Sequence, residues 1–323
     1  MSDIRSFLSP QVNNFIYFRR TSGNWNESSY EPNLRLFDRY IAENYPGLCT
    51  LTQEMVDTWC AKRETENNNS CRSRIYAVVS FIKYLRERNI TDIGLPEIPR
   101  KEKRTYIPHS FTDTELKDFF RECDAISVYN NNPSHKLRKI VVPVFFRLLF
   151  SSGMRTTEAR LLKRDGVDLD TGIVNIRNSK GHNQHYVVLH DSMSLLMRRY
   201  DVAADKLMPG RKFFFPSTQD KPHPRGWVVW NFNVLWSKVS NESATAYELR
   251  HNYATHNINN WTESGFGFDD KLLYLSKSMG HSYTEETKKY FSIVPTISDI
   301  LREKTQGSMD VIIPEVHKNE ETN

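Results

Sequence analysis

The sequence predicts a mainly α-helical protein with one small three-stranded β-sheet, an α+β fold in two domains. Three observations support this prediction. Apolar residues recur at helical spacing through the first hundred positions, a basic stretch with several prolines follows, and a short strand-like region interrupts the helices of the second half. At 323 residues, the chain is long enough for two domains.

Residues 1–97 are expected to form a small helical bundle. Apolar side chains recur at helical spacing around residues 34–41, and the pattern ends at an Asn-Tyr-Pro-Gly sequence. Thr52 is the expected N-cap of a second helix. A third helix is expected from about Cys71 to Arg88, and no strand pattern is visible in this region.

The segment 98–108 is expected to link this bundle to the second domain. Prolines at positions 96, 99 and 108 favour an extended backbone, and four of the five residues at 100–104 are basic. The basic residues could contact phosphates of a nucleic acid. A solvated linker without such contacts is an equally simple interpretation.

A second domain is expected at 109–306, followed by a polar tail at 307–323. Capping residues predict a helix start near Thr112, and the apolar run Val141–Leu149 predicts a buried helix with Pro143 near its beginning. Residues 166–177 then predict two strands joined by an Asp-Thr-Gly turn, and His185–Leu189 predicts a third strand. Helices resume from Trp227.

Composition sets limits on function. The formal net charge is +5 and the pI about 8.9, a basic excess compatible with nucleic acid but too small to establish it. The four cysteines lack metal-ligand spacing, so we expect free thiols and neither a metal nor another cofactor. No apolar run reaches the ~18 residues of a membrane span, and we expect a soluble cytoplasmic protein.

Residues able to act on a phosphodiester occur in five segments of the second domain. Two arginines are suited to bind phosphate oxygens, because guanidinium is always charged and offers paired donors. A lysine in a turn, a histidine and a tyrosine add proton-transfer and nucleophilic groups. In chain order the segments contain Arg155 with Glu158, Lys180, Tyr247 with Arg250 and His251, Gly280 with His281, and Tyr290.

This ordered set resembles the tyrosine recombinase (phage-integrase-type) family. The family pattern is an Arg with a Glu three residues later, a Lys on a β-turn, a His-x-x-Arg-His box, a Gly-His pair and a Tyr about nine residues on. The resemblance covers about residues 110–300. Each motif alone is weak, whereas five in this order are specific. The resemblance implies that the helical bundle is a core-DNA-binding domain and that residues 109–306 form the catalytic domain.

The resemblance also implies a role for each residue. Arg155 and Arg250 would stabilise the charge on the scissile phosphate, and Lys180 would protonate the leaving 5′-oxygen. His281 would contact the phosphate or position the nucleophile, and Glu158 would orient the cationic cluster. Tyr290 would form a covalent 3′-phosphotyrosyl bond, which conserves the phosphodiester energy for rejoining.

Tyr247 departs from the family pattern, which has a histidine at this position as the expected proton acceptor. A tyrosine with a pKa of about 10 is a poor base at neutral pH. His251 or water could share the role, so the identity of the base stays open.

Several residues have competing interpretations. Lys163 is the main rival of Lys180. His182 and His185 are expected to be solvated loop histidines that could touch DNA. The tryptophans at 227, 230 and 236 have roughly helical spacing and are expected in the core rather than stacked on bases.

The predicted function is site-specific DNA recombination or integration, for a mobile genetic element. The alternatives are a DNA-binding accessory protein that has lost its chemistry and a type IB topoisomerase-like enzyme. The expected partners are duplex DNA with recombination sites, further copies of the chain in a tetramer on DNA, and sibling recombinases, with no membrane. The expected location is the bacterial cytoplasm, in association with the nucleoid. Residues 294–304 could pack on a neighbouring protomer or on their own domain.

Overall fold

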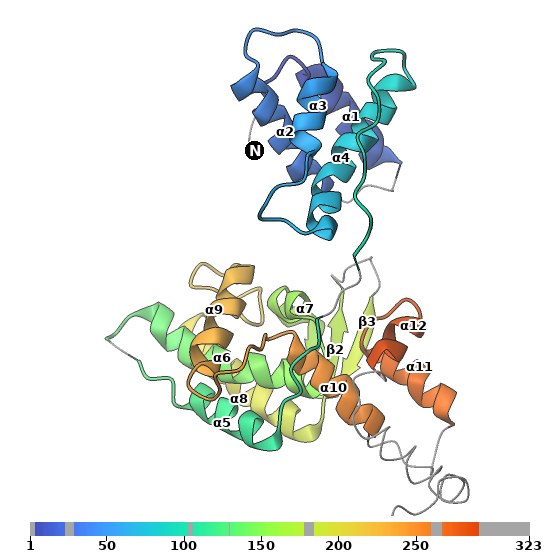
Figure 1. The fold of residues 1–323 in the computed structure, drawn as a ribbon. Coiled ribbons are helices and arrows are strands. Elements are labelled where there is room, and N and C mark those ends of the chain that lie inside the picture. The colour runs from blue at the N-terminus through green and yellow to red at the C-terminus, as the bar shows by residue number, and fades with distance from the viewer. Residues whose placement is uncertain are drawn as a thin grey trace, which may run out of the picture. The chain divides into compact units, whose positions relative to one another are not determined.

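The computed structural model describes residues 4–22, 29–102, 106–128, 130–177, 184–259 and 267–290. The chain forms two compact units, Met1–Thr105 and Tyr106–Asn323 (Figure 1). This division falls within the segment 98–108. The expected fold class is confirmed, because the described residues form helices and one small sheet. Lys180, the segment 294–304 and the tail 307–323 lie outside the described residues.

Unit 1 consists of α-helices around one apolar core. The Thr52 hydroxyl caps its third helix as predicted, by accepting a hydrogen bond from the Met55 amide at 3.4 Å. The Asn67 side chain caps the fourth helix in the same way. The described helices of this unit are α1 (Ser9–Thr21), α2 (Tyr30–Asn44), α3 (Gln53–Cys60) and α4 (Asn68–Arg86).

Two buried charged side chains fix the connections of unit 1. The Asp38 carboxylate accepts hydrogen bonds from the amides of Arg5, at 2.6 Å, and Ser6, at 3.2 Å, so it holds the chain that leads into α1. Arg74 pairs with Glu66 and donates to the Ala61 carbonyl at 2.8 Å, which holds the loop before α4. Both groups satisfy the rule that a buried charge needs partners.

Unit 2 combines helices with the small sheet. A reciprocal capping box of Thr112 and Glu115 begins its first helix, as the sequence predicts. The described elements are α5 (Asp113–Asp124), α6 (Pro133–Ser152), α7 (Thr156–Arg160), the 3-10 helix η1 (Arg164–Gly166), β1 (Val167–Asp168), β2 (Ile173–Ile176), β3 (His185–Val188), α8 (Asp191–Leu207), α9 (Arg225–Trp236), α10 (Glu248–Asn259), α11 (Phe268–Ser278) and α12 (Glu285–Lys288).

The sheet is an antiparallel meander in the order β1-β2-β3, so the predicted three-stranded sheet is confirmed. Val167 pairs with Val174 across β1 and β2, and Ile176 pairs with His185 across β2 and β3. Figure 1 shows the strands between α7 on one side and α11 and α12 on the other. The meander therefore lies beside the helices that carry the candidate catalytic residues.

The buried helix α6 differs from its prediction. It begins at Pro133, eight residues before the expected start, so Pro143 lies inside the helix rather than near its beginning. Asn132 and Pro133 provide a helix start that the apolar pattern missed, since the Asn132 side chain accepts from the Ser134 amide at 2.9 Å. Burial of α6 against α5, α8 and α10 offsets the backbone hydrogen bond that Pro143 cannot donate.

The expectation of three core tryptophans is wrong for Trp230. Trp236 is buried, but Trp230 is 55% exposed. The two residues are six positions apart on α9, which places them about 120° apart around a helix. The core-facing side of α9 carries Val228, Phe232 and Leu235, so Trp230 lies on its outer side.

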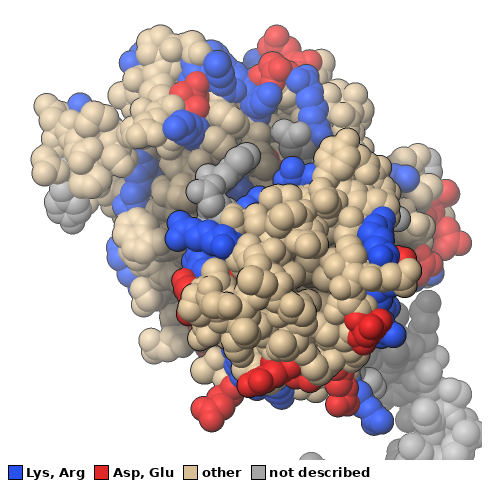
Figure 2. Space-filling view, turned by 90° about the horizontal axis from the view of Figure 1, so that it is seen from above, with Lys and Arg blue, Asp and Glu red and all other residues tan. Residues whose placement is uncertain are grey.

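The surface carries both signs of charge. Figure 2 shows Lys and Arg side chains in several separate groups on the visible face, with Asp and Glu gathered in others. This distribution agrees with the modest net charge of +5. Among the described helices, none has the length and apolar character needed to cross a membrane.

Candidate active site

Four segments of unit 2 bring most of the predicted site residues together. Arg155 precedes α7, Arg250 lies on α10, His281 follows α11, and Tyr290 follows α12. Arg155 donates a hydrogen bond to the Gly280 carbonyl at 3.1 Å, and Arg250 contacts His281 at 2.8 Å. Residues far apart in the sequence therefore form one cluster.

A tight turn between α6 and α7 positions Arg155. Gly153 ends α6 in the left-handed conformation with φ 63°, which glycine adopts without strain. Glu158, 3% exposed, accepts from the Arg155 amide at 2.8 Å and from its Nη1 at 2.6 Å. One carboxylate thus holds both the main chain and the guanidinium of Arg155, and the orienting role of Glu158 in catalysis stays a prediction.

Arg250 is the most deeply buried cation of the cluster, with 1% of its surface exposed. Its Nη1 donates to the Gly153 carbonyl at 2.6 Å, and its Nη2 donates to the Met279 carbonyl at 2.8 Å. Its Nε is buried and has no hydrogen-bond partner among the described residues. Arg250 therefore fastens the α6–α7 turn and the end of α11 to α10, and it keeps one donor uncommitted.

His281 is neutral at physiological pH. Burial, together with the positive charges of Arg250 and Arg155, lowers the pKa of its imidazole to about 3. Guanidinium can only donate, so the Nε2 atom accepts from Arg250. The proton is then on Nδ1, which lies 2.7 Å from Oγ1 of the buried Thr287. These two contacts fix the tautomer and the orientation of the ring.

The candidate nucleophile Tyr290 is buried in this cluster, with 5% of its surface exposed. Its ring lies nearly parallel to that of His281, with centroids 6.2 Å apart, and 5.1 Å from the ring of His251. Burial raises the pKa of the Tyr290 hydroxyl, and the nearby charge of Arg250 opposes that rise. The phenol is therefore protonated at neutral pH and needs a proton acceptor before it can attack.

His251 lies between Tyr290 and Tyr247. The rings of Tyr247 and His251 are 5.2 Å apart in an edge-on arrangement, and Tyr247 is 42% exposed. Burial and the charge of Arg250 lower the pKa of His251 to about 4, so its ring is neutral. Its Nδ1 is buried without a hydrogen-bond partner in the described part of the chain. A neutral imidazole thus lies close to the nucleophile.

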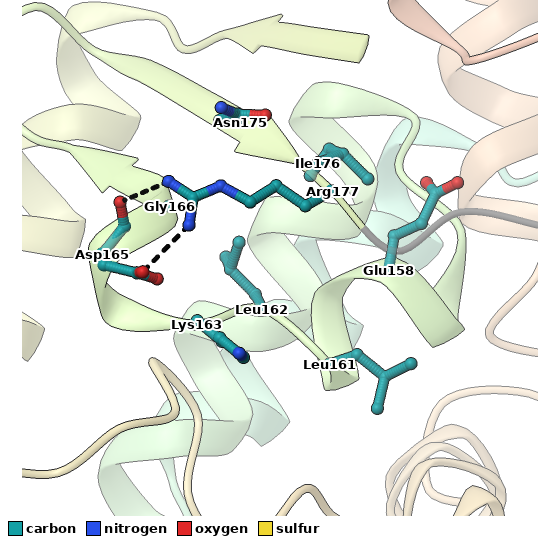
Figure 3. A pocket seen from close by; sticks show the side chains of 9 residues that line it. All are labelled: Glu158, Leu161, Leu162, Lys163, Asp165, Gly166, Asn175, Ile176 and Arg177. Atoms are coloured by element: carbon teal, nitrogen blue, oxygen red, sulfur yellow. Dashed lines mark hydrogen bonds and ion pairs between the residues drawn. The ribbon is translucent and has the colours of Figure 1, made fainter. Parts of the chain in front are cut away.

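Lys180, the expected general acid, belongs to the undescribed segment between β2 and β3. Its rival Lys163 is exposed and lines a small pocket of about 110 Å³ behind α7, beside the ion pair of Arg177 and Asp165 (Figure 3). The Glu158 carboxylate points away from Lys163 in this view. Lys163 therefore does not share the contacts of Glu158 with Arg155.

His185 is not the solvated loop histidine that the sequence favours. It is 9% exposed on β3, and its Nε2 lies 3.9 Å from the Glu158 carboxylate. Gly280 has φ 64°, and a Cβ atom at this position would come within 2.5 Å of the His185 ring. Gly280 is therefore needed for close packing against His185 as well as for the turn before His281.

Sequence patterns did not predict Thr287, which fixes His281, or Tyr253, whose ring covers Gly153. A Cβ atom at Gly153 would come within 2.3 Å of the Tyr253 ring. No local pattern identifies Thr287, because its role depends on α12 folding back against His281. Its position six residues after His281 is the one available signal.

The assembled site suits an oxyanion. Two guanidinium groups converge, and Glu158 is the carboxylate that pairs with one of them. Phosphate oxygens match such donors in charge and geometry. A buried tyrosine beside Arg250 gives the same site a nucleophile.

Comparisons with known proteins agree with this geometry. The model of the phage integrase family matches residues 110–295, more than half of the chain. The chain is 24% identical over 301 residues to y4rE of Sinorhizobium fredii, named as an integrase/recombinase, with 90% of this chain and 94% of that protein covered. It is 26% identical over 237 residues to tyrosine recombinase XerA of Thermococcus kodakarensis, with 71% and 73% covered.

Solved structures share the fold. The XerH site-specific recombinase bound to palindromic difH substrate in a post-cleavage complex has a TM-score of 0.59 at 16% identity, covering 88% of this chain and 80% of that one. The Tn1549 transposon integrase bound to transposon right end DNA has a TM-score of 0.58 at 14% identity, covering 92% and 98%. At these identities, the structural likeness supports the fold alone.

Proposed function

Since the chain belongs to the phage integrase family, we propose that it cuts and rejoins DNA at specific sites through a covalent bond between Tyr290 and a 3′-phosphate. The observation that carries this proposal is the buried contact of Tyr290 with Arg250 and His281. A tyrosine beside a fixed guanidinium is placed for attack on a bound phosphodiester.

The reaction exchanges one phosphoester for another. The Tyr290 oxygen bonds to phosphorus, the bond from phosphorus to the 5′-oxygen breaks, and the phenol proton passes to a base. The leaving 5′-oxygen takes a proton from a general acid. Rejoining reverses each step, so neither a nucleotide cofactor nor an oxidant is needed.

The cationic residues stabilise the transition state. Arg155 and Arg250 donate to the non-bridging oxygens, where the charge is spread, and loss of either costs on the order of 3–4 kcal/mol of barrier. Lys180 is the general acid, by the family resemblance. His251 is the favoured proton acceptor, supported by its neutral ring, its unpaired Nδ1 and its place between Tyr247 and Tyr290.

The wider context follows from the relatives. One structural neighbour is a transposon integrase, and another is a λ integrase tetramer bound to a Holliday junction. We therefore propose that this chain serves a mobile genetic element and assembles as a tetramer on two DNA sites. Unit 1 would act as the core-DNA-binding domain.

A covalent-capture experiment tests the function. The protein is incubated with duplex DNA that carries its recombination site, nicked just 3′ of the cleavage point so that rejoining fails. We expect a protein–DNA adduct that resists SDS for the native chain and none for Tyr290→Phe. An adduct with Tyr290→Phe, or none with the native chain, would overturn the assignment.

Two further assays, a gel shift and plasmid relaxation, separate the alternative functions. A DNA-binding accessory protein would shift the duplex in a gel without forming an adduct, whereas a type IB topoisomerase would relax supercoiled plasmid of any sequence. Tyr247 is the observation that favours the accessory protein, because it replaces the expected base. The intact set of Arg155, Arg250, His281 and Tyr290 favours the active enzyme.

A further inference from the structure

His185 on β3 lies against two groups that bind the Arg155 guanidinium. Its Nε2 atom is 3.9 Å from the Glu158 carboxylate, and its ring packs on the main chain of Gly280. Glu158 accepts a hydrogen bond from Nη1 of Arg155 at 2.6 Å, and the Gly280 carbonyl accepts one from Nη2 at 3.1 Å. A single imidazole therefore lies beside an acceptor of each Nη atom.

The contact between His185 and Gly280 is close. A Cβ atom at Gly280 would lie 2.5 Å from Cε1, 2.6 Å from Nδ1 and 2.9 Å from Nε2 of the His185 ring. These three atoms are neighbours in the imidazole, so its Cε1 corner faces the main chain of Gly280. Because His281 is the next residue, the His185 ring limits how far the main chain before His281 can approach the sheet.

The strand β3 fixes the orientation of His185. Residues of β3 alternate between buried and exposed, and His185 is 9% exposed whereas the adjacent Tyr186 is 64% exposed. His185 also pairs with Ile176 of β2 in the antiparallel register. The strand therefore directs the imidazole into the interior of unit 2, towards Glu158 and Gly280.

The surroundings of His185 are polar on the sides that face the site. The Glu158 carboxylate is 3% exposed, so a nitrogen of the imidazole gives it a polar neighbour that an apolar side chain would not provide. Burial is the main cause of the low pKa of His281, and the charge of His185 is among the lesser causes. His185 therefore lies near His281 as well as near Glu158.

We propose that His185 is a positioning residue for DNA cleavage, which holds the Glu158 carboxylate and the Gly280 main chain in place and, through them, the Arg155 guanidinium. The proposal rests on the proposed function and assigns His185 no contact with the phosphate. Displacement of a catalytic group by about 1 Å can cost ~10²-fold in rate. Loss of His185 should therefore slow cleavage although Arg155 itself is intact.

Three substitutions separate the two contacts of His185. His185→Ala removes both, whereas Gln and Met are unbranched side chains of similar size, of which only Gln has a polar end group for Glu158. The rate of single-turnover adduct formation on the nicked duplex should fall in the order native, His185→Gln, His185→Met and His185→Ala, with a loss of about 10²-fold for the last. A rate for His185→Gln no higher than that for His185→Met would contradict the action through Glu158.

A second substrate distinguishes a displaced Arg155 from general damage to the fold. A methylphosphonate at the cleavage point replaces one charged non-bridging oxygen by a methyl group, so the transition state carries one negative charge fewer and depends less on the guanidinium. On this duplex the deficit of His185→Ala relative to the native chain should shrink to less than about tenfold. Equal deficits on both substrates, or no deficit on the ordinary phosphate, would overturn the proposal.

Val187→Ala is the matched control. Val187 lies two positions further along the buried side of β3, is 2% exposed and belongs to the apolar core of unit 2. Its variant loses core packing, so any deficit in rate should be the same factor on the two substrates. His185→Met keeps the volume of the side chain, and its comparison on the two substrates decides the question if His185→Ala fails to fold.

The result is distinguishable from a failure of the proposed function. A native chain that forms the Tyr290 adduct while the His185 variants match it on both substrates would refute the role of His185 alone. A native chain that forms no adduct on either substrate would refute the proposed function, and the role of His185 with it.

Discussion

The Nη2 atom of Arg250 lies 2.8 Å from the Nε2 atom of His281, so a permanent cation and a neutral imidazole form one buried unit. Because the guanidinium occupies Nε2, His281 can donate to a phosphate from that atom only after the contact is exchanged and Nε2 carries a proton, either by protonation of the ring or by a change of tautomer. An incoming phosphate carries the charge that favours this exchange.

Thr287→Val should slow DNA cleavage about tenfold, equivalent to ~1.4 kcal/mol of barrier. The substitution removes the acceptor of the Nδ1 proton and leaves that buried donor unsatisfied. Single-turnover adduct formation on the nicked duplex measures the effect. Thr287→Ser keeps the hydroxyl and should react at a rate close to the native one. Equal rates for Val and Ser would show that Thr287 does not orient His281.

Gly153→Ala should destabilise the protein by more than the ~1–2 kcal/mol cost of the left-handed backbone. Its new Cβ would also clash with the Tyr253 ring and displace the carbonyl that Arg250 binds. Gly210→Ala is the matched control, because Gly210 has a similar φ of 71° and open space around it. Urea unfolding of both variants isolates the clash, and equal losses would argue against it.

His251→Gln should reduce cleavage by about 10²-fold or more, the usual loss when a general base is removed. Tyr247→Phe should cost less than about tenfold, because Tyr247 is 42% exposed and its phenol is a poor base. Rates of adduct formation at neutral pH compare the two variants. A larger loss for Tyr247→Phe would transfer the role of proton acceptor to Tyr247.

Lys180→Ala should reduce cleavage by about 10²–10⁴-fold on ordinary DNA, because the 5′-oxygen leaves poorly without a proton. Sulfur in place of that oxygen leaves without protonation, so a 5′-thio substrate should restore most of the rate. Lys163→Ala is the matched control, and it should behave like the native chain on both substrates. Restoration for the Lys163 variant instead would identify Lys163 as the acid.

Acid should destabilise the fold through its buried histidines. Burial lowers the pKa of His281 to about 3 and that of His251 to about 4, below the value of about 6.5 for an unfolded chain. Between these values the unfolded chain binds protons that the folded chain does not. The contribution of these histidines to the free energy of unfolding is therefore fully present above pH ~6.5 and is lost as the pH drops towards ~4.

A variant isolates this effect. Between pH 7 and pH 5, His251→Gln should lose about 2 kcal/mol less of its unfolding free energy than the native chain does. His190→Gln changes an exposed histidine and should show the native pH dependence. Parallel urea titrations at the two pH values provide the measurement. Identical pH dependence for all three proteins would contradict a buried neutral His251.

The sequence predicted those features that depend on local patterns. Thr52 and Thr112 cap the starts of α3 and α5, as the local sequence predicts. The Asp-Thr-Gly turn lies between β1 and β2 as expected. Arg155, Arg250, His281 and Tyr290 were identified by their order along the chain. Their mutual contacts could not be predicted, because α6, α10 and α11 bring them together only in the folded unit.

The errors share one physical cause, which is packing between distant segments. Pro143 is tolerated inside α6 because that helix packs against α5, α8 and α10, and no sequence pattern predicts this packing. His185 is buried because Gly280, nearly a hundred residues later, presents a bare backbone to its ring. Trp230 is exposed because α9 has a single core-facing side.

The double hold of Glu158 on Arg155 limits how this site can change over evolutionary time. The carboxylate binds the amide of Arg155 at 2.8 Å and its guanidinium at 2.6 Å, so a residue that keeps one contact and loses the other disturbs both the helix start and the cation. Aspartate is shorter by one methylene and cannot span both distances from the same backbone position. A substitution at either residue is therefore expected to be tolerated only when the other residue is replaced as well.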